Sequence, residues 1–264
     1  MTEFAAEARD DGHAIRCVAR GLARIRNERP RVHGLTNTVA QAFTANVLLA
    51  IGAVPTMTGA AEEVAEFVAG SRALYVNLGT MDAARRAGID EGVSVARRHG
   101  VPWILDPAHC EAATTRVTYA RSLLARGPAL LRLNAREYAA LFGDAEPLDA
   151  VRKTDCPILR TGVTDHLTDG SRSLALSNGV DWQDRVTAIG CAGTAIMAAF
   201  LAVGCSAWDA AIGGATVMNV AAEMAAERAR GPGSFAVELI DSLHAIAEDD
   251  IVARIRLAEE HSGR

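Results

Sequence analysis

The chain has 264 residues, of which half are apolar and only 5% aromatic, and its formal net charge is −5. This is enough apolar sequence to bury a large core, and the acidic balance without a long basic run argues against a nucleic-acid partner. The five cysteines are scattered without a CxxC pair, so the sequence favours neither a disulfide framework nor a zinc ribbon.

The N-terminal sequence MTEFAAEARDDGHAIRC carries acidic residues and lacks the apolar segment of a signal peptide. No uninterrupted apolar stretch reaches the roughly 20 residues that cross a bilayer. We therefore expect a cytoplasmic protein without a membrane partner. The only lysine is Lys153, so there is no GxxxxGK[ST] phosphate loop. Any phosphate must instead be held by helix N-termini, backbone amides and arginine.

Apolar periodicity and turn residues predict the elements of the first half of the chain. In order, they are a helix at 10–27, a helix capped by Thr36 or Asn37 that ends before Gly52, a strand at 53–57, a helix at 61–70, a buried strand at 73–79, a helix at 82–99 stopped by Gly100, and a buried strand at 101–107.

The second half continues the alternation of helices and strands. In order, we predict a helix at 116–126, a strand at 129–134, a helix at 135–142 closed by Gly143, a weak helix, a strand at 156–162, a hairpin around Asp169-Gly170, a turn and helix at 186–200, a long helix at 206–229 and a final helix at 231–246. Repeated strand–helix alternation indicates one α/β domain over 1–264, with a mostly parallel sheet and helices on both faces.

In such a sheet, ligands bind beyond the carboxyl ends of the strands. Polar residues follow four predicted strands, at 77–80, 106–107, 134–137 and 161–162. Because parallel strands end at the same edge, we expect these four groups to lie together and to form the site.

The segment VTAIGCAGTAIMAAF, at 186–200, places Cys191 at the start of an apolar helix. Free amides and the helix dipole at this end favour an anion such as a phosphoryl group. They would also lower the pKa of the thiol toward neutrality, so that Cys191 could take a proton from a substrate hydroxyl. The alternative is a small buried residue that packs beneath the turn.

Two carboxylates and an arginine are candidates for phosphate chemistry. Asp106 and Glu137 each follow a strand, and both could hold magnesium directly or through water. Alternatively, Asp106 caps the next helix and Glu137 occupies its own helix's first turn. Arg116 could contact phosphate through its planar fork, or it could be an ordinary surface arginine.

Together these segments resemble the hydroxyethylthiazole kinases of the ribokinase-like superfamily. The resemblance extends through most of the chain, and its motifs follow the family's order. The motifs are VHGLTNTVAQAFTANVLLAIGAVPTM, NLGT, ILDP, NAREYAAL, TGVTDHLTDG, VTAIGC and RGPGSFAVELI. The resemblance implies ATP- and Mg²⁺-dependent phosphorylation of a thiazole alcohol in thiamine salvage, by a trimer with its thiazole pockets between subunits.

The resemblance also implies roles for individual residues. Cys191 would be the catalytic base in place of the aspartate of most ribokinase-like enzymes. The implied thiazole contacts are Asn37, Met57, Gly79, Thr80 and Ala188; the implied ATP contacts are Arg116, Asn134, Thr161 and Gly190; and the implied magnesium ligands are Asp106 and Glu137.

The chain departs from the family on the nucleotide side. Ala188 stands where the usual TGxGC turn has its first glycine, and the segment 108–113 lacks the usual glycines, although Arg116 is retained. Leu133 and Val163 replace a glycine and a glutamate. These changes motivate an alternative function, in which an impaired family member binds a thiazole-like ligand without phosphoryl transfer. A third possibility is a ribokinase-like enzyme that acts on another small alcohol.

Overall fold

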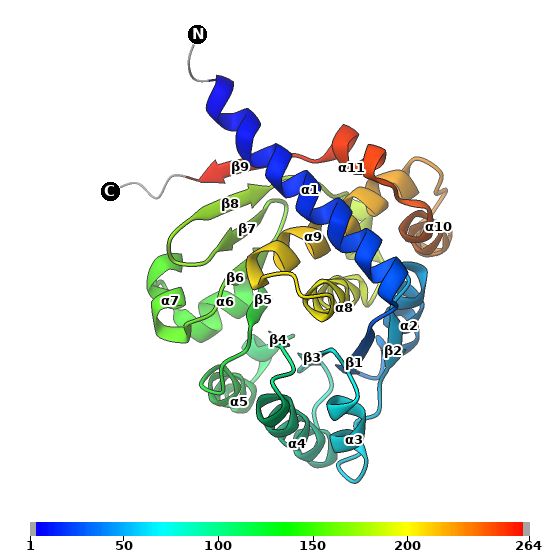
Figure 1. Cartoon of the computed structure of the whole chain (residues 1–264). Coiled ribbons are helices and arrows are strands. Elements are labelled where there is room, and N and C mark those ends of the chain that lie inside the picture. The colour runs from blue at the N-terminus through cyan, green and yellow to red at the C-terminus, as the bar shows by residue number, and fades with distance from the viewer. Residues whose placement is uncertain (1–3, 261–264) are drawn as a thin grey trace.

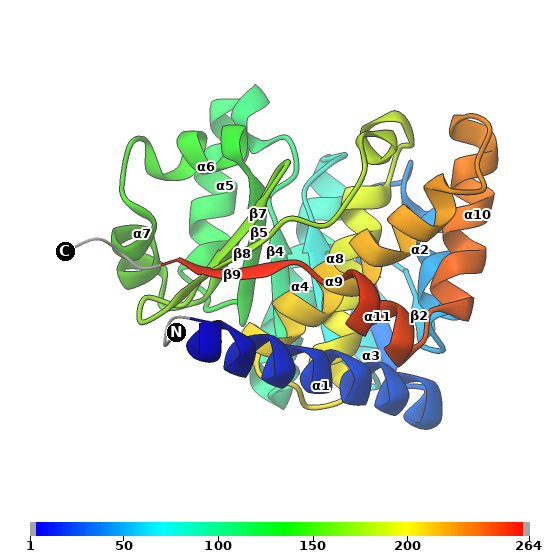
Figure 2. The same cartoon turned by 90° about the horizontal axis from the view of Figure 1, so that it is seen from above.

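The computed structural model describes residues 4–260, with side chains from residue 12 onward. Its centre is a nine-stranded sheet in the order β2-β1-β3-β4-β5-β6-β7-β8-β9, with helices on both faces (Figures 1 and 2). Neighbouring strands are parallel from β2 to β6 and antiparallel from β6 to β9. The predicted α/β class with a mostly parallel sheet is therefore confirmed.

The strands are short, as expected of segments buried between two helical layers. They are β1 Arg31–Leu35, β2 Val54–Thr56, β3 Ala73–Asn77, β4 Trp103–Asp106, β5 Leu130–Asn134, β6 Ile158–Thr161, β7 Asp165–Thr168, β8 Ser173–Leu176 and β9 Leu257–Glu260. All five residues of β3 are buried, and they alternate between the two faces. Ala73 and Tyr75 join one apolar core, whereas Leu74 and Val76 join the other.

The helices divide between these two cores. On one face lie α1 Phe4–Glu28, α2 Gln41–Ala50, α8 Ile189–Ala202, α9 Ala207–Ala226, α10 Pro232–Ala245 and α11 Glu248–Arg254. On the other lie α3 Val64–Ala69, α4 Ala83–His99, α5 Thr114–Leu124, α6 Ala135–Phe142 and α7 Pro147–Thr154. Short 3₁₀ helices span η1 Cys110–Ala112 and η2 Asp181–Arg185. Figure 1 shows α1 as an outer layer that crosses α9, while α8 lies on the sheet itself.

Most of the predicted elements are present, but several differ in extent or position, and α1 begins at Phe4 rather than at residue 10. The hairpin around Asp169-Gly170 forms from β7 and β8, and Gly100 ends α4 with a left-handed φ of 66°. However, α2 begins only at Gln41, because the Asn37 side chain accepts a hydrogen bond from the backbone of residue 40 and forms a separate turn before the helix. The helix at 116–126 begins and ends two residues earlier. Finally, α10 is not the last helix, since α11 and the edge strand β9 follow it.

The predicted alignment of polar residues at one sheet edge is confirmed by the strand register. Asn77 pairs with Asp106 across β3 and β4, and Asn134 pairs with Thr161 across β5 and β6. All four residues end their strands. Parallel pairing thus brings groups from distant parts of the sequence to the same edge, where α8 also begins.

Candidate active site

The sulfur of Cys191 is held by two side-chain amides at the N-terminus of α8. Asn37 Nδ2 donates to Sγ at 3.2 Å, and Asn77 Nδ2 donates at 3.4 Å. The two amides come from the turn after β1 and from the end of β3. As a whole residue, Cys191 is partly exposed.

The predicted fall in the pKa of Cys191 is wrong. Burial, followed by the nearby Asp106 carboxylate, raises the pKa of this thiol to about 12. Arg132 and the Asn37 amide act in the opposite direction but do not compensate. The helix dipole is too weak to overcome removal from water together with a neighbouring negative charge. The thiol is therefore protonated at neutral pH.

Asn37 and Asn77 also fix one another. Asn77 Oδ1 accepts hydrogen bonds from Asn37 Nδ2 and from the backbone N–H of Gly79, both at 3.0 Å. A Cβ at Gly79 would lie 2.8 Å from the Asn37 side chain, so only glycine permits this approach. Thr80 Oγ1 accepts a hydrogen bond from the backbone of residue 38 at 3.3 Å. The structure thus brings together Asn37, Gly79, Thr80 and Cys191. We call this wall, with Asn77, the alcohol side, after the role that the family resemblance implies for it.

Met57 lies in a segment that a buried histidine holds in place. The His33 ring hydrogen-bonds through Nδ1 to Thr56 Oγ1 at 2.8 Å and through Nε2 to the Thr58 carbonyl at 3.0 Å. Because a carbonyl can only accept, Nε2 carries the proton. Burial lowers the pKa of His33 to about 4, so the ring is neutral at physiological pH.

Asp106 lies at the end of β4 and is almost fully buried, with 1% of its surface exposed. Its Oδ2 accepts a hydrogen bond from Thr194 Oγ1 at 2.9 Å and lies 3.8 Å from the Arg132 guanidinium. Oδ1 has no hydrogen-bond partner among the described residues. Asp106 therefore does not cap the following helix. Instead it keeps one buried carboxylate oxygen available.

Glu137 occupies the first turn of α6, as one of the two interpretations of the sequence expected. Its Oε2 accepts from the backbone N–H of Asn134 at 2.8 Å, which completes a capping box, and its Oε1 accepts from the backbone of His109 at 2.9 Å. Burial, and then the negative charge of Asp106, raise the pKa of Glu137. The carboxylate thus links the loop at 108–113 to the start of α6.

A cavity of about 620 Å³ opens beside the first turn of α8. This volume is within the range of small-molecule sites. The lining includes three predicted nucleotide contacts, Asn134, Thr161 and Gly190, together with Arg132 and residues of β7, η2, α8 and α9. The glycine-free loop at 108–113, expected to add bulk here, lies outside this lining. We call Asp106, Arg132, Glu137 and Gly190 the nucleotide side.

Two arginines differ in what they contact. Arg116 Nη1 donates to the carbonyls of Leu78, at 2.9 Å, and Ala108, at 3.4 Å, and so ties the end of β3 to the loop that follows β4. Arg132 instead lines the cavity and crosses the first turn of α8, with its guanidinium nitrogens 3.1 and 3.2 Å from where a Cβ on Gly190 would be. A guanidinium next to free helix amides is an arrangement suited to phosphate.

The turn before α8 keeps a glycine-like backbone despite its alanine. Ala188 has a φ of 75°, in the left-handed region, and the backbone N–H of residue 192 donates to its carbonyl at 2.9 Å. The first amides of α8, from Ile189 onward, are therefore arranged at a regular helix N-terminus. The substitution leaves a strained residue in the turn but keeps its conformation.

Sequence reasoning missed several polar residues of the cavity, among them Arg132, Asp165 and Asn219. Asp165 accepts from the backbone of Gly162 and from Asn219 Nδ2, each at 3.0 Å, and burial raises its pKa. One signal was available for Arg132, since a charged residue between Leu131 and Leu133 must leave the apolar core.

Comparison with known proteins identifies the family. A sequence model of the hydroxyethylthiazole kinase family matches residues 22–249. The chain belongs to this family. It is 42% identical over 239 residues to the probable hydroxyethylthiazole kinase of Agrobacterium fabrum, a match that covers 90% of this chain and 94% of that protein. Membership of a kinase family confirms the predicted class of enzyme, a phosphotransferase.

Solved structures agree with this assignment. The hydroxyethylthiazole kinase protein from Pyrococcus horikoshii OT3 superposes with a TM-score of 0.89 and 34% identity, over 92% of this chain and 99% of that one. A ribokinase-like superfamily protein from Enterococcus faecalis, 12% identical, gives a TM-score of 0.62 over 84% of this chain and 89% of its own. This second match concerns the fold alone, and the two together confirm the ribokinase-like architecture. Within residues 4–260, no helix combines the length and apolarity that a bilayer crossing requires.

Proposed function

We propose that this protein transfers the γ-phosphoryl group of ATP to the hydroxyl of 4-methyl-5-(2-hydroxyethyl)thiazole, a step of thiamine salvage. The observation that carries this proposal is the position of Cys191. In the first turn of α8, its sulfur accepts hydrogen bonds from the side-chain amides of Asn37 and Asn77. The preceding residue, Gly190, lines the cavity of about 620 Å³. An alcohol and a phosphoryl donor can thus approach the same helix end from two sides.

On the alcohol side, we assign the thiazole contacts to Asn37, Met57, Gly79, Thr80 and Ala188. The network around Asn77 holds Asn37 and Gly79 in fixed positions, and His33 fixes the segment that carries Met57. Such a wall orients the hydroxyl toward the donor without reorganising when the ligand arrives.

On the nucleotide side, we assign the phosphate and nucleotide contacts to Arg132, Asn134, Thr161 and Gly190. The guanidinium of Arg132 and the free amides of α8 supply positive potential where charge develops during transfer. Arg116, which the family resemblance also implies as an ATP contact, would act on the same site through the strand end and loop that it joins.

The residues fit a magnesium ion. Asp106 Oδ1 is a buried carboxylate oxygen to which no described residue donates. Glu137 lies close enough to Asp106 that the Asp106 charge raises the pKa of Glu137. Two carboxylates beside one guanidinium form an oxygen-rich, net negative site, as Mg²⁺ requires. We assign Mg²⁺ to Asp106, and to Glu137 through water because both Glu137 oxygens already accept backbone hydrogen bonds. When bound, the ion would neutralise phosphate charge.

The high pKa of the Cys191 thiol limits what this side chain can do in the reaction. As the alcohol oxygen forms its bond to phosphorus and the bond to ADP breaks, the hydroxyl must lose its proton. A protonated thiol cannot take that proton, so Cys191 first orients the hydroxyl by hydrogen bonding. When positive charge in the site offsets Asp106, the largest charge that opposes its ionisation, the thiol can release its own proton to solvent, and the thiolate can then take the proton of the hydroxyl.

The direct test measures ADP formation with and without the thiazole alcohol, at saturating ATP and Mg²⁺, with mass detection of the phosphorylated product. We expect ADP release that depends on the alcohol. A panel of other small heterocyclic alcohols, including pyrimidines, separates the proposed substrate from others. Turnover of a different alcohol with none of the thiazole would overturn the proposed substrate but keep the kinase.

A second candidate function is a thiazole-binding protein without phosphoryl transfer. The observation that favours it is the strained Ala188 in the turn that should cradle the phosphoryl group. Calorimetry distinguishes the two functions, because a pure binder would bind the alcohol but give neither ATP–Mg²⁺ binding nor ADP. Detectable nucleotide binding in the cavity would count against this alternative.

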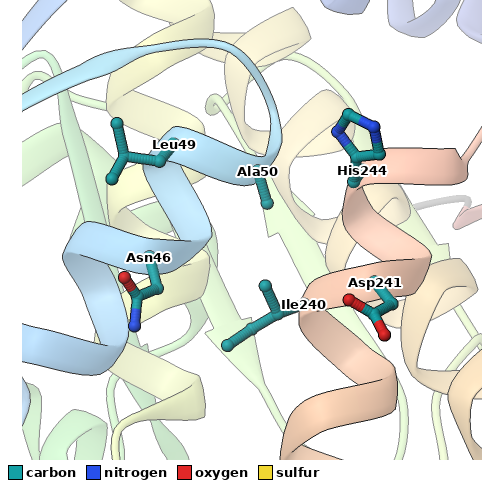
Figure 3. Close-up of a pocket in the computed structure, with 6 residues that line it drawn as sticks. All are labelled: Asn46, Leu49, Ala50, Ile240, Asp241 and His244. Atoms are coloured by element: carbon teal, nitrogen blue, oxygen red, sulfur yellow. The ribbon is translucent and has the colours of Figure 1, made fainter.

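We further propose that the whole chain acts as one domain, located in the cytoplasm, and assembles into a homotrimer. Exposed apolar side chains support an oligomer, since Leu49 on α2 is 54% exposed and Val237 on α10 is 60% exposed. A shallow hollow of about 520 Å³ separates these two helices (Figure 3). Light scattering of the wild type and of Leu49→Glu tests the assembly, and a monomeric wild type would refute it.

A further inference from the structure

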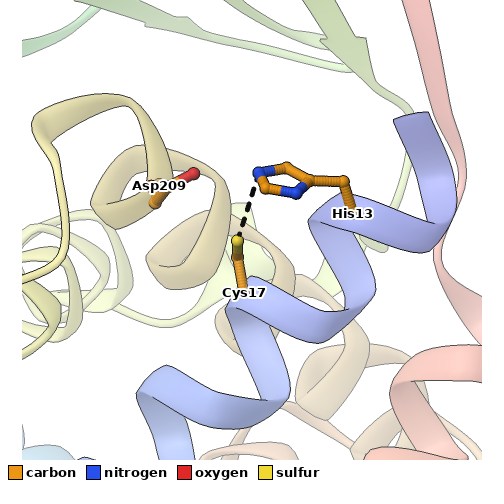
Figure 4. Close-up of side chains that lie close together, drawn as sticks. All are labelled: His13, Cys17 and Asp209. Atoms are coloured by element: carbon orange, nitrogen blue, oxygen red, sulfur yellow. Dashed lines mark hydrogen bonds between the residues drawn. The ribbon is translucent and has the colours of Figure 1, made fainter. Parts of the chain in front are cut away.

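Outside the candidate active site, three side chains with metal-binding atoms converge. His13 and Cys17 lie one turn apart on α1, and Asp209 lies in the first turn of α9 (Figure 4). Their nitrogen, sulfur and carboxylate oxygen all lie within 4.8 Å of one another. In Figure 4 the Asp209 carboxylate points toward the His13–Cys17 pair.

The spacing of the pair matches a tetrahedral metal. Cys17 Sγ lies 3.4 Å from His13 Nε2. With Zn–S near 2.3 Å and Zn–N near 2.0–2.1 Å, two ligands of a tetrahedral zinc ion lie roughly 3.5 Å apart. The i and i+4 positions of a helix place both side chains on one face without rearrangement. The two atoms therefore already have the separation that zinc imposes.

The third ligand is oriented by a neighbour. Ser206 Oγ, at the N-cap of α9, lies 2.7 Å from Asp209 Oδ2 and accepts a hydrogen bond from the Asp209 backbone at 3.1 Å. A hydroxyl that fixes a ligating carboxylate is the kind of outer contact that metal sites use. His13 is exposed and the other two ligands are partly exposed, so water can fill a fourth position.

We propose that His13, Cys17 and Asp209 bind one Zn²⁺ ion, with water as the fourth ligand. A thiolate, an imidazole and a carboxylate form a ligand set that suits zinc better than the harder Mg²⁺ or Ca²⁺. The ion fastens α1 to the start of α9. It thereby stabilises the folded chain, because the assembled site binds it more tightly than the unfolded protein does.

This inference is independent of the proposed kinase activity. His13 and Cys17 precede residues 22–249, the span that the family model matches. None of the three ligands belongs to the alcohol side or the nucleotide side. We therefore regard the zinc site as a property of this chain rather than of the family, with a role in stability rather than in the reaction.

The test uses the full-length protein after chelator treatment and titrates it with Co²⁺ and then with Zn²⁺. We expect one Co²⁺ per chain, with thiolate-to-cobalt charge transfer and the intense visible bands of tetrahedral cobalt, all bleached by Zn²⁺. Cys17→Ser should abolish the charge-transfer band and weaken Zn²⁺ binding at least about 100-fold, since even outer contacts account for 10–100-fold. Zn²⁺ should raise the melting temperature of the wild type but not of Cys17→Ser.

Two further variants serve as matched controls. Cys205→Ser removes another partly buried thiol near Asp209, and His99→Ala removes an exposed histidine at the end of α4. Both should bind Zn²⁺ like the wild type, whereas His13→Ala and Asp209→Asn should bind more weakly. Circular dichroism confirms that each variant is folded. An equal loss in Cys205→Ser, unchanged binding in Cys17→Ser, or no cobalt band in the wild type would overturn the site.

Discussion

The two sides of Cys191 are built in opposite ways. On the alcohol side, neutral amides satisfy one another, as Asn37 and Asn77 share a hydrogen bond and both donate to the sulfur. On the nucleotide side, charged groups are buried with incomplete partners. Asp106 Oδ1 and Arg132 Nε both lack a hydrogen bond to any residue within the described part of the chain.

This difference indicates which of the two sides binds charged ligands. A neutral network whose members pair with one another is stable without a ligand, whereas a buried carboxylate oxygen and guanidinium nitrogen without partners are costly unless something pairs with them. A cation near Asp106 and an anion near Arg132 would remove both penalties. The alcohol side is thus preformed, and the nucleotide side is completed by what it binds.

The largest expected effect comes from the atom shared by both sides. Cys191→Ala should lower kcat by about 10²–10⁴-fold, the range for loss of a group that handles the reacting proton. The alcohol should still bind, because Asn37 and Gly79 keep their own contacts. Alcohol-dependent ADP release measures the loss, and Cys205→Ser is the matched thiol control. Full turnover in Cys191→Ala would remove the sulfur from the mechanism.

The second-largest expected effect shows whether Arg132 or Arg116 contacts the nucleotide. Arg132→Lys keeps a charge near Asp106 but loses the planar fork, and we expect kcat/KM for ATP to fall about 100-fold. Arg116→Lys should mainly lower stability, because the side-chain hydrogen bonds of Arg116 to other described residues go only to backbone carbonyls. Steady-state kinetics with varied ATP, alongside urea unfolding, compares them. A larger loss of kcat/KM in Arg116→Lys would reverse the assignment.

A smaller effect concerns the support of the alcohol side. His33 has a pKa of about 4 when folded, against about 6.5 when unfolded. As pH falls from 6.5 to 4, His33 becomes protonated in the unfolded chain but stays largely neutral in the folded chain. The free energy of unfolding therefore falls by about 3 kcal/mol. Urea unfolding at pH 7 and pH 4 measures this. His33→Gln should lose correspondingly less, and equal acid sensitivity of both proteins would contradict the argument.

Much of this site could be predicted from the sequence because it depends on strand ends. Asn77, Asp106, Asn134 and Thr161 each follow a short apolar run, and parallel pairing alone places them at one edge. The position of Cys191 followed from the apolar helix after its turn. These features are local, so pattern and topology were sufficient.

The environment of Cys191 could not be predicted in the same way. Its pKa depends on burial and on the Asp106 charge, and these arise only when segments distant in sequence pack together. The zinc site differs again, because the spacing of His13 and Cys17 is visible in the sequence but Asp209 is remote. Likewise, α11 and β9 are short and rich in charge, and they form by packing on elements already in place.

The smallest expected effect tests whether the turn before α8 limits the nucleotide side. Ala188 has a φ of 75°, which costs a side-chain-bearing residue about 1–2 kcal/mol, whereas glycine adopts it freely. After the entropy that glycine loses on folding, Ala188→Gly should stabilise the protein by about 0.5–1 kcal/mol. Urea unfolding measures this, and Ala139→Gly in α6 is the control.

At position 139 the backbone is helical, so the same substitution should destabilise by about 1 kcal/mol. Opposite signs at the two positions would locate the strain in the turn, whereas equal signs would show that Ala188 is not strained. Activity adds a second comparison. If Ala188→Gly is more stable yet turns over the alcohol at the wild-type rate, the alanine is tolerated by a working phosphate site. If turnover appears only with glycine, the natural chain is the impaired binder, and the methyl group of Ala188 is the reason.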